Sequence, residues 1–279
     1  MSSGLSHAAY SASAESLAGC VLGALRGAGN TAVVAAHLRA AEGEPPTTGV
    51  VGGTTRAPGR SAGVAAVRIL GADVLAPCLL TGQLLPLEES DAVRMSLQAL
   101  PPAPRPPSAP PQGREAPWIR AWTDWGLVTA LERLDPALGG APAPVPQGPP
   151  PCGGAAPRHR AARTTGDFPG GGSGEGWVPW SWRMGLLASL ALPGLDGPVH
   201  DAARSHVLAL ARGATRAVLR RDFLSAARIT RWLAWLAAEG TALPLDAALL
   251  TQDIALRGGG DRCLLDTEIT HNLLGLETV

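Results

Sequence analysis

Apolar positions in the last third of the chain recur every three or four residues, which is typical of helices with one buried face. From residue 177 onward, Gly and Pro are scarce, and several stand where helices would begin or end. Pro198 and Pro244 suit helix starts, Asp222 suits an N-cap, and Gly240 and Gly258 suit helix ends. The pattern predicts a helical bundle domain over 177–279, with helices at 180–192, 199–220, 222–239, 245–257 and 262–275.

Residues 1–100 show a weaker helical pattern. Between residues 11 and 117 there is no aromatic residue, so a core there must use Ala, Val and Leu, which bury less area per side chain. We therefore expect a weakly packed N-terminal helical region. Its pattern predicts helices at 13–26, 31–41 and 89–100, and a strand at 64–70.

A tryptophan stripe stands between two Gly/Pro-rich segments. Trp118, Trp122 and Trp125 share one face of a predicted helix over 118–134. A Pro-rich linker at 101–117 precedes it, and residues 135–176 follow, with too little apolar surface to offset the entropy of ordering. We expect this second linker to be disordered. Since the stripe cannot be buried by its own helix, we expect the helix to dock on the C-terminal bundle or on another copy of the chain.

Composition weakens several functional arguments. The chain has 23 arginines, no lysine, one Tyr and two Phe, which indicates a very GC-rich genome. Arginine-rich or tryptophan-rich stretches are therefore poor evidence of function. The 23 acidic residues balance the arginines, which removes the general electrostatic argument for a nucleic-acid or anionic-membrane partner.

Localisation and cofactor use are inferred from what the sequence lacks. The N-terminus has no secretory signal, and the apolar run Met184–Leu192 is too short to span a bilayer, so we expect a cytoplasmic protein with no membrane partner. The four cysteines form no C-x-x-C pair, so no metal site is expected. No catalytic motif is recognised, and we predict neither catalytic residues nor a cofactor.

One glycine turn has the outline of a dinucleotide-binding motif. Gly27-Ala-Gly29-Asn-Thr-Ala32 follows an apolar segment and precedes a helix-like one. The motif requires a preceding strand, but CVLGAL fits a helix better. A helix-turn-helix connection explains the same residues.

A ligand pocket among the C-terminal helices is one alternative for function. Glu268 and His271 have the spacing of half a di-iron carboxylate site, but the chain has no second copy of the pair. Together with Asp266 and with Trp232 or Trp235, they could line a pocket for a small ligand or an enzyme's substrate. An exposed helix face with an ion pair explains the same spacing.

Nucleic-acid binding is another alternative. Arg212, Arg216 and Arg220 fall on one helix face, where they could contact successive phosphates. Further arginines follow at 221, 228 and 231. In a chain without lysine, a solvated Arg-rich helix face is the simpler interpretation.

The leading hypothesis is a mainly α-helical accessory or protein-interaction protein without enzymatic activity, which binds a protein partner or self-associates. Apolar, tryptophan-bearing helix surfaces would mediate the binding. The candidate residues are Trp118, Trp122, Trp125, Trp177, Trp180 and Trp182.

Overall fold

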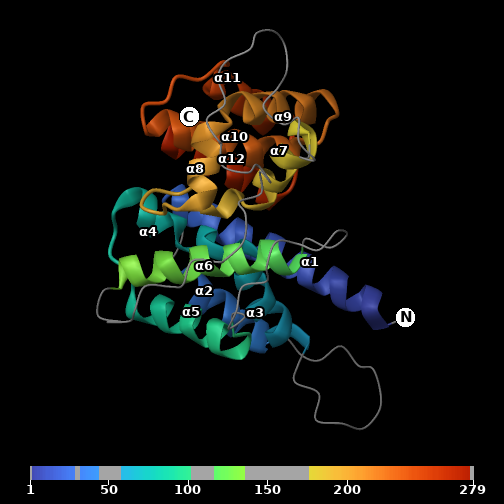
Figure 1. The fold of residues 1–279 in the computed structure, drawn as a ribbon. Coiled ribbons are helices and arrows are strands. Elements are labelled where there is room, and N and C mark those ends of the chain that lie inside the picture. Colours follow the sequence, from blue (N-terminus) through green and yellow to red (C-terminus); the bar gives the residue numbers. More distant parts are fainter. Residues whose placement is uncertain (1, 29–31, 44–57, 102–115, 136–175, 277–279) are drawn as a thin grey trace.

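Helices make up most of the described structure. The structure is a computed structural model that describes residues 2–28, 32–43, 58–101, 116–135 and 176–276, and no strand occurs within these ranges. The expectation of a mainly α-helical protein is confirmed (Figure 1). Most of the two predicted linkers, and so the expected disorder of the second, lies outside the described residues.

Five α-helices and a short 3₁₀ helix form the N-terminal group. They are α1 (Ser2–Leu25), α2 (Val33–Gly43), α3 (Pro58–Leu70), η1 (Gly71–Leu75), α4 (Ala76–Thr81) and α5 (Leu87–Ala99). The predicted strand at 64–70 is wrong, because these residues belong to α3. Ala62, Ala66 and Leu70 are buried at four-residue spacing, and this burial outweighs the weak helix propensity of the valines and isoleucine around them.

The C-terminal group follows the predicted punctuation with three changes. It comprises α7 (Trp177–Leu186), η3 (Ala188–Leu190), α8 (Pro198–Ser205), α9 (Val207–Leu219), α10 (Phe223–Ala238), α11 (Ala247–Arg257) and α12 (Asp261–Leu273). The helix expected over 180–192 begins at Trp177 and ends at Leu186. The single helix expected over 199–220 divides at His206 into α8 and α9. Asp222 caps α10 by accepting a hydrogen bond from the Ser225 amide, as expected. The next helix begins after its N-cap Asp246 rather than at Pro244.

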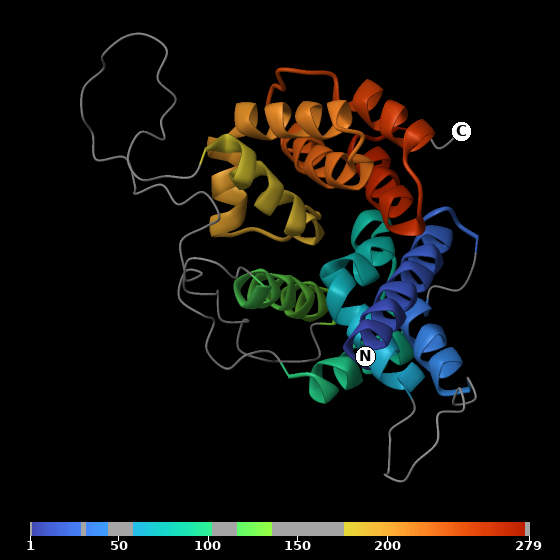
Figure 2. The ribbon, with the colours of Figure 1, turned by 90° about the vertical axis from the view of Figure 1, so that its right-hand side faces the viewer.

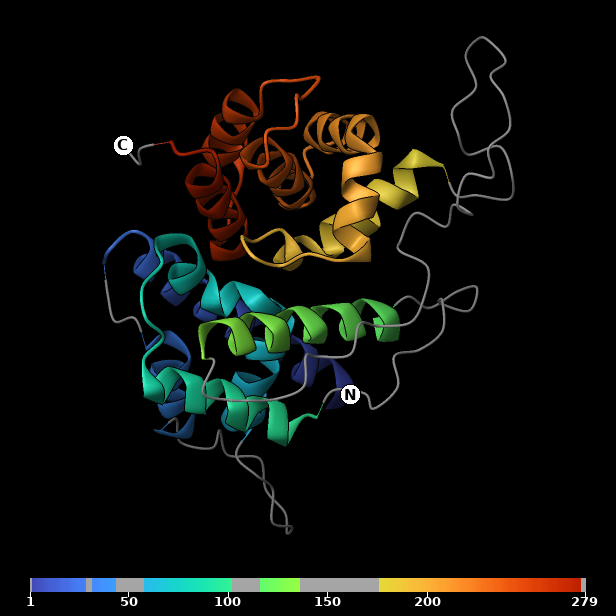
Figure 3. The ribbon, with the colours of Figure 1, turned by 60° about the vertical axis from the view of Figure 1, so that its left-hand side comes forward.

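Helix α6 (Ala116–Leu134) lies along the boundary between the two groups. Figures 1 and 3 show it on the side of the N-terminal group that faces the C-terminal helices. Trp118, Trp122 and Trp125 are buried in one hydrophobic cluster with Trp180 and Trp232 of the C-terminal group. The tryptophan stripe therefore packs against the C-terminal helices.

The two groups also share a second hydrophobic cluster. Leu192, Leu195, Leu265 and Ile269 pack with the buried Ala, Val and Leu side chains of α1 to α5. Figure 2 shows α12 reaching down to α1 at this contact. The hydrophobic core of the N-terminal group therefore continues into side chains of the C-terminal group.

One stretch of the described chain is long and apolar enough to cross a membrane by length and composition alone. It covers residues 59–81, and its most apolar 18-residue window has a mean hydropathy of 1.8 and is 78% buried inside the protein. It consists of α3, η1 and α4, and Gly71 interrupts it with a φ of +59°. A mostly buried core segment passes the same test.

Candidate functional site

A cavity of about 950 Å³ lies between the two helix groups. Its charged lining residues come from α3, η1, α6, α10 and α12, and they are Arg68, Asp73, Arg120, Arg228, Arg262 and Asp266. Apolar side chains of Ile69, Ile119, Leu186 and Leu265 form much of the remaining wall, together with Trp182. Of these lining residues, Arg120 (56% exposed) and Trp182 (48% exposed) are the most exposed. They mark the mouth of the cavity at the protein surface.

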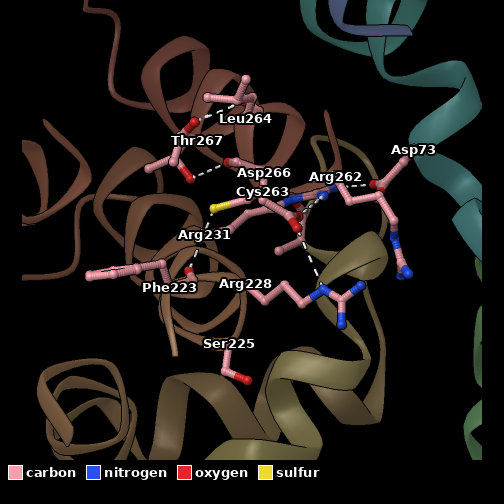
Figure 4. A network of polar contacts seen from close by, with 12 residues as sticks. Asp73, Phe223, Ser225, Arg228, Arg231, Arg262, Cys263, Leu264, Asp266 and Thr267 are labelled. Carbon is pink, nitrogen blue, oxygen red and sulfur yellow. Dashed lines mark hydrogen bonds and ion pairs between the residues drawn. The ribbon is translucent and has the colours of Figure 1, made fainter. Parts of the chain in front are cut away.

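Arg231 joins the two groups directly beside this cavity. Its guanidinium is fully buried and donates to Asp73 Oδ1 of η1 at 2.6 Å, to Asp266 Oδ1 of α12 at 3.2 Å and to the Ala191 carbonyl at 3.2 Å (Figure 4). Burial alone would lower the pKa of Arg231, but the two carboxylates outweigh burial and raise it. Arg231 therefore stays charged and bridges both aspartates.

Asp266 is shared by two arginines. Besides Arg231, it has Arg228 as an ion-pair partner, with 3.5 Å between Arg228 Nε and Asp266 Oδ2. Figure 4 shows both arginines converging on this carboxylate from α10. Asp73 and Asp266 are thus already matched by the positive charges of Arg228 and Arg231.

Arg262 is a third arginine on this side of the cavity, and it forms no ion pair with Asp73 or Asp266. Its backbone amide donates to Glu15 Oε2 at 3.1 Å, whereas its half-buried guanidinium has no hydrogen bond or ion pair within the part of the chain that the structure describes. Burial lowers the pKa of Arg262, the neighbouring charge of Arg228 lowers it further, and the opposing effects of Asp266, Glu15 and Asp73 do not cancel these two causes. Both causes disfavour a second cation here, and a bound anion would relieve both.

The opposite wall holds a similar arrangement. Asp124 of α6 is buried and accepts from Arg68 Nε at 2.8 Å, and Arg120 Nε lies 3.8 Å from its Oδ2. Arg68 also donates to the Leu100 carbonyl. One carboxylate therefore serves two arginines on this wall.

A glycine brings Asp73 to the cavity. Gly71 has a φ of +59°, a left-handed conformation that L side chains rarely adopt. A Cβ at this position would lie 2.5 Å from Thr123 Cγ2 of α6. The turn from α3 into η1 therefore requires glycine in order to pack against α6 and present Asp73 to Arg231.

The predicted ligand-pocket residues do not surround one cavity. Only Asp266 lines it. Trp232 and Trp235 are buried in the core, where both contact the ring of His200. Glu268 is buried and forms an ion pair with Arg26 at 2.9 Å, and His271 lies half-buried in the last turn of α12.

The tryptophans expected to face a partner are mostly internal. Trp118, Trp122, Trp125 and Trp180 are each at most 6% exposed, because they fill the cluster beneath the C-terminal helices. Trp177 is half-buried, and Trp182 is exposed at the cavity. Apart from these last two, the six candidates have no open face for a partner.

The arginines considered for nucleic-acid binding divide into two sets. Arg212, Arg216 and Arg220 line a second cavity of about 710 Å³ along α9, beside the exposed Leu208 and Leu219. We call this surface the α9 groove. The arginines at 228 and 231, which we interpreted as part of a solvated face, are instead turned inward to Asp266.

The glycine turn lacks the strand that a dinucleotide site requires. The residues before Gly27 belong to α1, and residues 29–31 lie outside the described structure. Over the same described ranges, no group of three or more His, Cys, Asp or Glu side chains is placed to hold a metal ion.

Most of the charged cavity residues were not among the predicted candidates. Arg120 and Asp124 carried a usable signal, because they stand four residues apart on the predicted tryptophan helix. Arg68, Asp73 and Arg262 carried none, since they are far apart in the chain and only the packing of the two groups brings them to one cavity. In comparisons with family models, with curated proteins and with solved structures, nothing matches this chain.

Proposed function

We propose that this protein binds a small organic anion in the cavity between its two helix groups. The observation that carries the proposal is the half-buried guanidinium of Arg262, which faces the cavity without an ion-pair partner in the described structure. A buried charge is costly unless it is paired, so an anionic ligand would supply the missing counter-charge.

The rest of the lining favours a ligand with an apolar body. Ile69 and Ile119 line the cavity, and the indole ring of Trp182 stands at its mouth. A mostly apolar cavity with a few convergent charged groups is typical of small-molecule sites, and its volume is within their usual range. The arginines would hold the anionic group, and the apolar wall would cover a ring or an aliphatic chain.

A protein-interaction role is a second candidate function. Because most of the candidate tryptophans are buried, the α9 groove takes their place as the candidate binding surface. Leu208 is 48% exposed and Leu219 is 80% exposed on one side of α9. Exposed apolar side chains gathered beside a groove favour a binding surface. This candidate does not depend on the anion cavity.

Calorimetric titration of the full chain with 2-naphthoate and with its neutral isostere 2-naphthamide tests the anion proposal. We expect the naphthoate to bind at least tenfold more tightly, and R262Q to lose about tenfold in naphthoate affinity, or ~1.4 kcal/mol. R257Q is the matched control, because Arg257 is 60% exposed on α11 and pairs only with Asp253 within the described structure. Equal affinities for acid and amide, or equal effects of R262Q and R257Q, would contradict the proposal.

A further inference from the structure

We infer that the ligand of this cavity carries a doubly charged head group, a phosphate monoester attached to an apolar body. This inference rests on the proposed function, because it specifies the chemistry of the anion that the cavity binds. It is carried by the distribution of charge over the two walls.

On the C-terminal wall, three arginines face two aspartates. Arg231 bridges Asp73 and Asp266, and Arg228 shares Asp266. The positive charge of Arg262 is left in excess. Glu15 also favours the charged form of Arg262, but it forms no ion pair with this side chain in the described structure, accepts from the backbone amide at the start of α12 and is not part of the cavity lining.

On the N-terminal wall, two arginines face one aspartate. Asp124 is bound by Arg68 through a hydrogen bond of 2.8 Å and lies 3.8 Å from Arg120. Arg68 is buried and tightly held, so Arg120 supplies the charge that a ligand can take up. Each wall therefore contributes one surplus positive charge to the same cavity.

A phosphate monoester matches this distribution. It carries a charge close to −2 above its second pKa of about 6, and it has three strong acceptor oxygens. Arginine guanidinium groups present planar arrays of donors that suit phosphate oxygens. A carboxylate or a sulfate ester has one negative charge, so it would leave one surplus arginine uncompensated.

The test compares 1-naphthyl phosphate with 1-naphthyl sulfate, which has the same shape and half the charge, by calorimetry at pH 8 on the full chain. We expect the phosphate to bind at least tenfold more tightly than the sulfate. R120Q and R262Q should each remove most of this preference, and R257Q should leave it unchanged. We expect R120Q to fold normally, because Arg120 is exposed and Asp124 keeps Arg68 as its partner.

The outcomes separate this inference from the proposed function. Equal affinities for phosphate and sulfate, with 2-naphthoate still binding more tightly than 2-naphthamide, would overturn the doubly charged head group and leave anion binding intact. An unchanged phosphate preference in R120Q would also overturn it, because the N-terminal wall would then contribute no charge. Failure of every anion to bind would overturn the proposed function itself.

Discussion

Replacing Arg231 by methionine removes the buried charge that joins the two helix groups. The variant loses hydrogen bonds to Asp73, Asp266 and the Ala191 carbonyl, and it leaves Asp73 buried with no other ion pair in the described structure. Breaking a buried ion pair by removing one partner costs about 3–5 kcal/mol. Because Asp266 keeps Arg228 as a partner, we expect the lower end, about 3 kcal/mol.

Urea unfolding of the full chain, followed by far-ultraviolet circular dichroism, measures this cost. With a slope of about 3 kcal/mol per molar urea, the midpoint should fall by about 1 M. R257M is the matched control, and we expect a change within about 0.5 kcal/mol, because the Arg257–Asp253 pair is exposed and lies within one helix. The double variant R231M/D73N should be more stable than R231M alone, since it leaves no unpaired carboxylate at Asp73. A loss below about 1 kcal/mol in R231M, or no recovery in the double variant, would refute the reasoning.

Three further predictions concern other parts of the structure. His200 is buried, its Nε2 donates to the Leu190 carbonyl at 2.9 Å, and burial lowers its pKa. The folded state therefore binds fewer protons, so the free energy of unfolding is undiminished above the unfolded pKa of about 6.5 and falls as the pH drops below it. H200Q should weaken this dependence between pH 7.5 and 5.5 in urea titrations, and an unchanged slope would contradict the assignment. G71A should cost about 2–4 kcal/mol in thermal or urea unfolding, from left-handed strain and from the clash with Thr123, and a neutral effect would show that the η1 turn relaxes freely. The nucleic-acid alternative, if it applies to the α9 groove, requires salt-dependent binding of duplex DNA that weakens in R216Q/R220Q, and no binding of DNA or RNA at low salt would end that hypothesis.

Local signals predicted the C-terminal helices well. Asp222 caps α10, and Gly240 follows that helix with a φ of +84°. Both effects depend on residues adjacent in sequence, so they can be recognised without knowing the fold. The break between α8 and α9 at His206 was missed, because the apolar period continues across it and no Gly or Pro marks it.

The N-terminal group was harder to predict for a physical reason. The valines and isoleucine of α3 favour a strand locally, and only burial against α1 and α2 makes that segment helical. The cavity could not be predicted at all from one sequence. Asp73 and Arg231 are 158 positions apart, and nothing in their local patterns indicates that they pair.

A crystal structure of the chain grown with 4-iodobenzoate tests the anion-binding account most directly, because the anomalous signal of iodine locates the ligand independently of the protein phases. The account predicts an iodine peak in the cavity between α6 and α12, with the carboxylate against Arg262 or Arg120 and the ring against Ile119 or Trp182. An iodine peak only in the α9 groove, or a carboxylate that contacts none of the cavity arginines, would contradict it.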